Sequence, residues 1–242
     1  MAVRWGAGGY LRINAQTSAA AVVGPTDPFF ASVVLLAGND NAANGTTTFI
    51  DQSGSAHALT RNGSAIYDGS SAPAGMSTSV SCPANTDYLS CASGTDFNFT
   101  TGDMTAECFM LCPISIPGFG ALFDSGNWRF VMVFNSTPTA LRLELNASQL
   151  GTSSAHNMVA GNWYHVAYSR SGGNFNIYVG GTRILSQADS TNIGNGTGPT
   201  FPFSVTGGQG INSNICSLRI TKGVGRYTGA TITPPTLPLP TS

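Results

Sequence analysis

Two glutamates and three histidines are the residues whose types could support acid–base chemistry, but their spacing argues against it. Glycoside hydrolysis needs two carboxylates that flank the scissile bond, and a pair on one strand gives a Glu-x-Asp-x-Glu pattern. Glu107 and Glu144 each stand alone in a strand-like stretch, which predicts that they lie on solvated faces. No serine or cysteine partner is evident in sequence for the histidines, which are His57, His156 and His165. We therefore predict no catalytic residues and expect the chain not to be an enzyme.

Oxygen-bearing side chains on loops could bind calcium, which needs six or more oxygen ligands from a rigid loop. The candidates are two sets, Asp40, Asn44 and Asp51 around Gly45, and Asp87, Asp96 and Asp103. No loop clusters three acids, so the favoured interpretation is that these side chains cap turns through hydrogen bonds to the backbone. Histidines at zinc-ligand spacing are also missing. We predict no metal site and no cofactor, and we expect His165 to be a hydrogen-bonded core or rim histidine.

Five cysteines give an odd count, which disfavours a complete disulfide framework. Cys108 and Cys112 lie four residues apart in a predicted strand, or about 13 Å, which is too far for a disulfide. Cys82 and Cys91 could meet across two strands, but a reduced pair is favoured in a chain that folds in a cytosol. We expect the cysteines to be small hydrophobic residues of the core.

Aromatic residues could form a platform for sugar binding, together with Asn and Asp side chains on loops at one end of a sandwich. The available aromatic residues are Tyr88, Trp128, Tyr164 and Tyr227. A sandwich core needs buried aromatic residues as well, so both interpretations stay open.

The composition excludes some partners. Only 9% of the 242 residues are charged, against about 25% in typical soluble domains, and the formal net charge is −1. The nine arginines are scattered and Lys222 is the single lysine, so neither nucleic acid nor an anionic membrane is an expected partner. Apolar runs such as Val33–Ala37 are too short to span a bilayer. The first residues lack the apolar core of a signal peptide.

Short strands separated by turns are the elements that would position these residues. The stretches predicted as strands are Ser32–Ala37, Thr46–Asp51, Met104–Leu111, Trp128–Phe134, Leu141–Leu145, Trp163–Arg170, Phe175–Val179 and Thr182–Ser186. Gly180 and Gly181 predict a two-residue type I′ hairpin, because glycine tolerates positive φ at both central positions. No window has helical periodicity. The pattern predicts an all-β fold, a two-sheet antiparallel jelly-roll sandwich.

Three zones follow along the chain. Residues 1–28 form a Gly/Ala-rich arm, residues 29–233 the sandwich, and residues 234–242 a Pro-rich tail expected to run extended over a surface. The isolated apolar residues of the arm cannot bury themselves and are expected to bind a partner. These partner-binding residues are Val3, Trp5, Tyr10, Leu11 and Ile13.

Two motifs carry a family resemblance over about residues 27–240. Residues 162–167 with 176–181 (NWYHVA and NIYVGG) resemble the "W-Y/H-H-V-A … L-Y-V-N-G" core of laminin-G-like, concanavalin A-like sandwiches. Residues 218–228 (LRITKGVGRYT), which run into Thr233-Pro234-Pro235, are similar to the "D-L-R-I-T-K-G-V-A-R-Y … F-T-P-P" ending of this fold in tailed-bacteriophage virion proteins. The acidic residues usual before that ending are replaced here by Cys216 and Ser217, which weakens any ligand site carried over to that edge.

The resemblance implies a non-enzymatic virion structural protein, a capsid decoration or head-fibre protein that displays the sandwich and is anchored by its N-terminal arm. Its implied partners are other virion proteins, capsid or tail subunits, and further copies of itself in a symmetric homo-oligomer such as a trimer. Its implied location is the virion, assembled in the cytoplasm of the host bacterium. The alternative is a carbohydrate-binding adhesion module of the tail or tail fibre that contacts host surface glycans.

Overall fold

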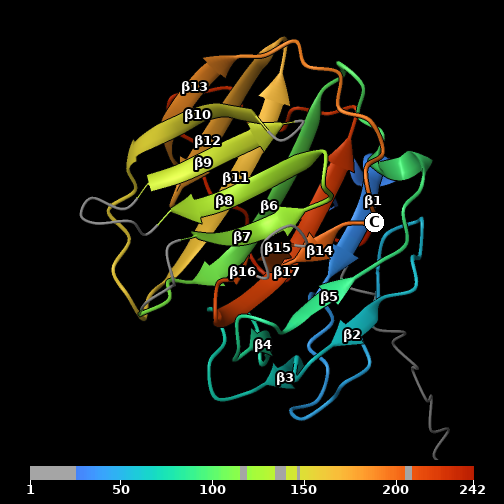
Figure 1. Ribbon diagram of the computed structural model, residues 1–242. Coiled ribbons are helices and arrows are strands. Elements are labelled where there is room, and N and C mark those ends of the chain that lie inside the picture. Colours follow the sequence, from blue (N-terminus) through green and yellow to red (C-terminus); the bar gives the residue numbers. More distant parts are fainter. Residues whose placement is uncertain (1–25, 115–118, 134–139, 146–147, 205–208) are drawn as a thin grey trace, which may run out of the picture.

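Two antiparallel β-sheets face each other and contain most of the regular structure of the chain (Figure 1). The structure is a computed structural model that describes residues 26–114, 119–133, 140–145, 148–204 and 209–242. The residues predicted to form a partner-binding arm, Val3 to Ile13, lie outside this part of the chain. Among the described residues, no helix has the length and apolar character needed to cross a membrane.

The first sheet has eight strands in the order β13-β12-β11-β6-β17-β4-β3, with β1 also paired to β17. These strands are β1 (Val33–Ala37), β3 (Ile66–Asp68), β4 (Ser79–Cys82), β6 (Met104–Leu111), β11 (Trp163–Ser171), β12 (Asn174–Val179), β13 (Thr182–Ala188) and β17 (Ser213–Lys222). The order places β6, from the middle of the chain, between β11 and the late strand β17.

The second sheet has seven strands in the order β10-β9-β8-β7-β14-β5-β2. These strands are β2 (Thr60–Asn62), β5 (Tyr88–Ser90), β7 (Phe119–Asp124), β8 (Trp128–Val133), β9 (Ala140–Leu145), β10 (Ser148–Ala155) and β14 (Thr200–Phe201). A separate pair is formed by β15 (Phe203–Ser204) and β16 (Gln209–Gly210), and two short 3₁₀ turns are η1 (Phe30–Ser32) and η2 (Thr95–Phe97). The predicted all-β class, with two antiparallel sheets in a sandwich, is confirmed.

The prediction of a strand over Thr46–Asp51 is wrong. Only Ile50 and Asp51 form single bridges, to Ala58 and Ala37. The carboxylate of Asp51 instead accepts hydrogen bonds from backbone N–H groups of Leu36 and His57, both at 2.8 Å. A side chain that bonds the backbone in this way turns the chain and competes with strand pairing.

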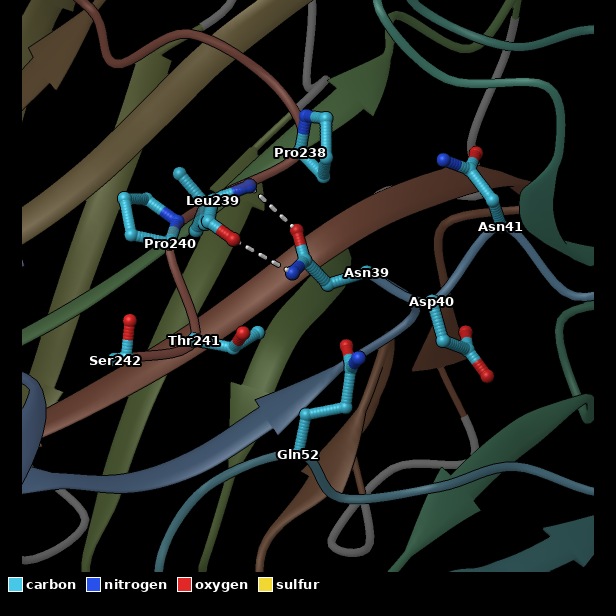
Figure 2. A pocket seen from close by; sticks show the side chains of 9 residues that line it. All are labelled: Asn39, Asp40, Asn41, Gln52, Pro238, Leu239, Pro240, Thr241 and Ser242. Carbon is cyan, nitrogen blue, oxygen red and sulfur yellow. Dashed lines mark hydrogen bonds between the residues drawn. The ribbon is translucent and has the colours of Figure 1, made fainter. Parts of the chain in front are cut away.

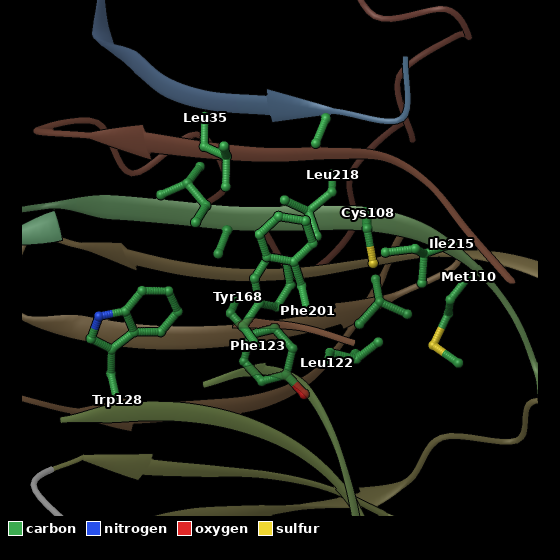
Figure 3. Close-up of a cluster of buried hydrophobic side chains, with 14 of the residues drawn as sticks. Leu35, Cys108, Met110, Leu122, Phe123, Trp128, Tyr168, Phe201, Ile215 and Leu218 are labelled. Carbon is green, nitrogen blue, oxygen red and sulfur yellow. The ribbon is translucent and has the colours of Figure 1, made fainter. Parts of the chain in front are cut away.

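Alternating side chains fill the space between the sheets, as the predicted strand pattern requires. Leu141, Leu143 and Leu145 on β9 are buried, while Arg142 and Glu144 between them are partly exposed. Trp128 is fully buried and packs edge-on against Phe99, with ring centroids 5.5 Å apart. Figure 3 shows part of this core; the labelled residues are Leu35, Cys108, Met110, Leu122, Phe123, Trp128, Tyr168, Phe201, Ile215 and Leu218.

All five cysteines are buried and none forms a disulfide, which confirms the expectation that they serve as small core residues. Burial raises the pKa of Cys82 and of Cys91 to about 12. A buried thiol with a raised pKa is a poor nucleophile, because the thiolate is the reactive form.

The C-terminal segment crosses the outer face of the eight-stranded sheet, and we call residues 223–242 the C-terminal strap. The Tyr178 hydroxyl on β12 donates to the Gly229 carbonyl at 2.9 Å. Further along, Leu239 is buried against Val33 and Leu36 of β1. The strap ends beside the start of the described chain, where the Asp27 N–H donates to the Ser242 carbonyl at 2.8 Å.

Candidate ligand-binding site

A polar pocket of about 400 Å³ opens between the loop that follows β1 and the end of the C-terminal strap (Figure 2). It is lined by Asn39, Asp40, Asn41, Gln52, Pro238, Leu239, Pro240, Thr241 and Ser242. Its volume lies within the range of small-molecule sites, about 300–1,000 Å³. Its polar groups are amides, a carboxylate and hydroxyls, which are groups that can recognise a neutral polar ligand.

Two residues with left-handed backbone shape the loop that carries three of these side chains. Gly38 has φ +64°, and a Cβ there would lie only 2.9 Å from the Cγ2 atom of Val80. Asn41 has φ +50°, and its Oδ1 accepts a hydrogen bond from the Ser77 N–H at 2.7 Å. Asparagine tolerates this conformation better than most residues, so the sequence fits the loop.

The side-chain amide of Asn39 connects the loop to the strap by bonding to both backbone groups of Leu239, as the backbone of a neighbouring strand would. Its Nδ2 donates to the Leu239 carbonyl at 2.9 Å, and its Oδ1 accepts from the Leu239 N–H at 2.7 Å. The Ser217 hydroxyl of β17 also donates to Oδ1 at 2.8 Å. The Asn39 amide therefore uses both acceptor positions of its oxygen and one of its two N–H donors to hold the pocket wall.

Asp40 is oriented by a neutral donor rather than by a cation. The hydroxyl of Tyr67 on β3 donates to Asp40 Oδ1 at 2.6 Å. Tyr67 is buried and stacks on Phe49. Burial, and then the hydrogen bond to Asp40, raise the pKa of Tyr67 well above its ordinary value, so the hydroxyl keeps its proton and remains the donor.

Gln52 is fixed by its backbone, and its side-chain amide forms no hydrogen bond with any residue that the structure describes. Its N–H donates to the Leu36 carbonyl of β1 at 2.8 Å, next to the turn that Asp51 caps. The amide is aimed at the loop of Asn39 and Asp40 (Figure 2). Its Oε1 is buried and accepts no hydrogen bond from any described residue. A buried acceptor without a partner costs free energy, and a ligand hydroxyl or amine placed here would remove that cost.

Of the pocket residues, the sequence reasoning singled out Asp40 alone, and as a calcium candidate. Asn39, Asn41 and Gln52 were missed. The run Asn39-Asp40-Asn41 directly after a buried strand was the available signal, since polar side chains at a strand end lie at one edge of the sandwich. Gln52 carried no such signal, because only the fold brings it to this edge.

The other calcium candidates are hydrogen-bonded to the backbone or to neighbouring side chains at separate places. Asn44 accepts from the Gly69 N–H, Asp103 from the Gly172 N–H, and Asp96 from the Ser55 hydroxyl. Asp87 accepts from the N–H groups of Ala84 and Ser64. Turn capping therefore explains most of the set, and within the described part of the chain no group of three or more His, Cys, Asp or Glu could hold a metal ion.

The aromatic residues considered for a sugar platform do not line this pocket. Trp128 is a core residue. The half-buried Tyr164 accepts from the Val159 N–H through its hydroxyl at 3.0 Å, and the Tyr227 hydroxyl donates to Glu107 at 2.6 Å. Tyr88 is half-buried on β5 of the other sheet.

Glu107 is the residue that the sequence misplaced. Predicted on a solvated face, it is 1% exposed, because the C-terminal strap covers this part of β6. Its Oε2 accepts from His165 Nε2 at 2.8 Å and from the Tyr227 hydroxyl. Its Oε1 pairs with the Arg219 guanidinium at 2.7 Å. The expectation that His165 is a hydrogen-bonded buried histidine is confirmed.

Asp27 continues this buried ion network to the start of the described chain. It pairs with Arg219 at 2.9 Å and with Arg226 of the strap at 2.8 Å. Burial by itself would raise the carboxyl pKa values, but the arginines and the hydrogen bonds to the two carboxylates outweigh it, and the pKa values of Asp27 and Glu107 both lie below their ordinary values. Neither is a protonated acid of the kind that glycoside hydrolysis requires.

Glu144, as predicted, lies on the outward face of its strand, where it is partly exposed and pairs with Arg129 at 2.9 Å and with Arg142. It lies on β9 of the seven-stranded sheet, whereas Glu107 lies on β6 of the eight-stranded sheet. The two glutamates therefore do not form a catalytic pair.

Comparison with known proteins agrees with this architecture. Domain 4 of the extracellular arabinanase AbnA from Geobacillus stearothermophilus, solved in complex with arabinotriose, is similar with a TM-score of 0.56 and 15% identity over 79% of this chain and 93% of that domain. The binding domain of botulinum neurotoxin serotype D is similar with a TM-score of 0.58 and 11% identity, over 81% of this chain and 49% of that one. The sialidase of Trypanosoma rangeli is similar with a TM-score of 0.53 and 11% identity, over 80% of this chain and 31% of that one.

The chain thus spans about half of the neurotoxin binding domain and about a third of the sialidase. Identities this low show a shared fold alone. No curated protein sequence matches the chain. A family model described as the concanavalin A-like lectin/glucanases superfamily matches residues 83–224, which is more than half of the 242 residues. The chain belongs to this superfamily.

Proposed function

We propose that the chain is a non-catalytic domain that binds a glycan in the polar pocket between the loop of residues 38–41 and the C-terminal strap. The observation that carries the proposal is the buried Oε1 of Gln52, which accepts no hydrogen bond from the described residues and lines a concave, polar site. The superfamily supports it, as does the similarity to an arabinanase domain solved with arabinotriose.

The pocket offers the complementary groups that a sugar hydroxyl needs, since each hydroxyl both donates and accepts hydrogen bonds. The Gln52 amide presents a donor and an acceptor. Asp40 presents a carboxylate oxygen, because only its Oδ1 is bonded to a described residue. Asn41 uses Oδ1 to hold Ser77, which leaves its Nδ2 as a donor. Pro238 and Pro240 add apolar walls.

A glycan array probed with the full chain tests the proposal, followed by titration of any glycan that is retained. We expect Gln52→Ala to weaken that binding at least tenfold, because a polar pair to a buried amide is lost. Gln187→Ala is the matched control, since Gln187 is exposed on β13 and its removal should leave binding unchanged. An array without any retained glycan, or equal binding by the Gln52 variant, would contradict the proposal.

A second candidate, a structural protein of a bacteriophage virion, rests on the motif of residues 218–228. One observation favours it: Arg219 and Arg226 of this motif hold Asp27, so the motif fixes the end of the proposed N-terminal arm to the sandwich. In this proposal the chain is a capsid decoration or head-fibre protein, anchored by its arm to capsid or tail subunits, and the glycan site contacts the host.

Removing residues 1–25 tests the second candidate separately from glycan binding. The shortened chain should fold and keep its glycan affinity but no longer join virions during assembly in the host. Incorporation at full occupancy without the arm would contradict the anchoring role, and equilibrium sedimentation of the full chain would test the proposed homo-oligomer.

A further inference from the structure

We propose that the polar pocket selects glycans that carry a protonated amine and rejects glycans that carry a carboxylate or sulfate. The inference rests on the proposed function and adds the chemical class of the ligand. It comes from the charge of the pocket: among its nine lining residues Asp40 is the single side chain that carries a charge, and none is Lys, Arg or His.

Asp40 differs from the acidic residues that this chain pairs with arginine. Asp27, Asp124, Asp189, Glu107 and Glu144 each lie within ion-pair distance of an arginine. Asp40 forms no ion pair with a described residue, and its one hydrogen-bond partner there is the hydroxyl of Tyr67 at 2.6 Å. A hydroxyl orients the carboxylate without neutralising it, so the negative charge remains uncompensated inside the pocket.

A protonated amine matches this arrangement better than a hydroxyl does. An ammonium group has three donors and no acceptor, and the pocket offers two acceptors that lack a protein donor, the second oxygen of Asp40 and the buried Oε1 of Gln52. Figure 2 shows Gln52 pointing toward the loop that carries Asp40, whose carboxylate is turned away from the strap. A charged donor makes a stronger hydrogen bond to a carboxylate than a neutral one. An anionic sugar would meet the same carboxylate with repulsion and no cation to offset it.

Three oligosaccharides of equal length separate these possibilities: glucosamine oligomers, their N-acetylated counterparts, and oligogalacturonate. Measured by calorimetric titration with the full chain at pH 6, where the glucosamine amine is largely protonated, glucosamine oligomers should bind at least tenfold more tightly than the acetylated ones. Oligogalacturonate should not bind measurably. The preference should shrink at higher salt, because charge pairs at a partly exposed site are screened.

Asp40→Asn should reduce the preference for the amine to less than about twofold while keeping the pocket shape. Asp68→Asn is the matched control: it removes one negative charge outside the pocket and should leave the preference intact. Tight binding of oligogalacturonate, or an amine preference that survives Asp40→Asn, would overturn the inference alone. A chain that binds none of the three oligosaccharides and no glycan on the array would overturn the proposed function as well.

Discussion

Glu107 joins three segments of the chain through one buried carboxylate. Its partners come from β11 (His165), β17 (Arg219) and the C-terminal strap (Tyr227). Two charges that leave water lose solvation, and the loss is offset only when the geometry and the added hydrogen bonds are good. Here both carboxylate oxygens are bonded. Removing one member of such a set leaves the others buried and unpaired, which is the larger penalty.

Replacement of Glu107 by Gln should therefore lower the free energy of unfolding by about 3 kcal/mol, since it leaves the Arg219 charge without its closest partner. Glu144→Gln removes the same charge from a partly exposed cross-strand pair and should cost less than about 1 kcal/mol. Urea denaturation at pH 7 measures both. Similar losses in the two variants would show that the buried network has no special role.

Acid should destabilise the protein through the same two carboxylates. The pKa values of Asp27 and Glu107 are lowered in the folded chain, whereas the unfolded chain has values of about 3.9 and 4.3. Their stabilisation is complete above about pH 5, where the unfolded carboxyls are also ionised, and it is lost as the pH falls toward the folded pKa values, because the unfolded state then binds more protons.

Urea midpoints measured from pH 7 to pH 2.5 should consequently begin to decrease below about pH 5. In the Glu107→Gln variant the midpoint starts lower but falls less steeply, because one of the two linked groups has been removed. A variant whose acid profile is parallel to that of the original chain would contradict the assignment.

The role of a residue could be predicted from the sequence only where the residues that surround it in space are also close to it in the sequence. The alternation around Leu141–Leu145 identified the buried positions because strand geometry alone decides them. The same alternation misplaced Glu107, since the residue that covers it, Tyr227, lies 120 positions later. Gln52 was missed for the same reason: its pocket is closed by residues 238–242.

At the scale of elements, the β12–β13 hairpin is the clearest case in which sequence determines local structure. Gly180 and Gly181 have φ +55° and +90°, which confirms the predicted turn. The two glycines differ in their surroundings. A Cβ on Gly180 would approach nothing closer than Tyr164 at 3.8 Å, whereas a Cβ on Gly181 would lie 2.5 Å from the Ile232 carbonyl of the strap.

Gly180→Asn should therefore change stability by less than about 0.5 kcal/mol, because asparagine is favoured in this turn type. Gly181→Ala should cost about 2 kcal/mol, since it adds a backbone clash to an unfavourable φ. Thermal unfolding followed by circular dichroism compares the two. Equal melting temperatures would show that the strap does not press on the turn.

The sequence predicted which segments form strands better than it predicted which strands pair with each other. The β-branched run Thr46–Asp51 had the composition of a strand, but the Asp51 carboxylate takes the backbone donors that pairing would use. The order of the strands in the sheet could not be predicted from the local sequence pattern either, because β6 pairs with β17, which follows it by more than 100 residues. Long-range pairing depends on which strand faces can be buried against each other. The alternation of apolar and polar residues shows only which face of each strand is buried.

For the molecule as a whole, the strap links stability to the proposed binding site. Leu239 packs on Val33 and Leu36 while its backbone is held by Asn39, so one residue both seals the outer face of β1 and forms a wall of the pocket. The two neighbouring prolines of the strap line the same pocket. A strap that detached would remove this wall without breaking the core between the sheets.

Leu239→Ala should accordingly lower the free energy of unfolding by about 2 kcal/mol, near the lower end for a buried leucine, because its cluster has only a few members. It should also weaken binding of whichever glycan the array identifies by at least fivefold, since the strap would be held less firmly against Gln52. Val159→Ala is the control, because Val159 is 60% exposed on a distant loop, and both quantities should stay unchanged there. If Leu239→Ala destabilised the fold but bound the glycan with full affinity, the strap would not be part of the site, and the ligand would have to contact the loop of residues 38–41 and Gln52 alone.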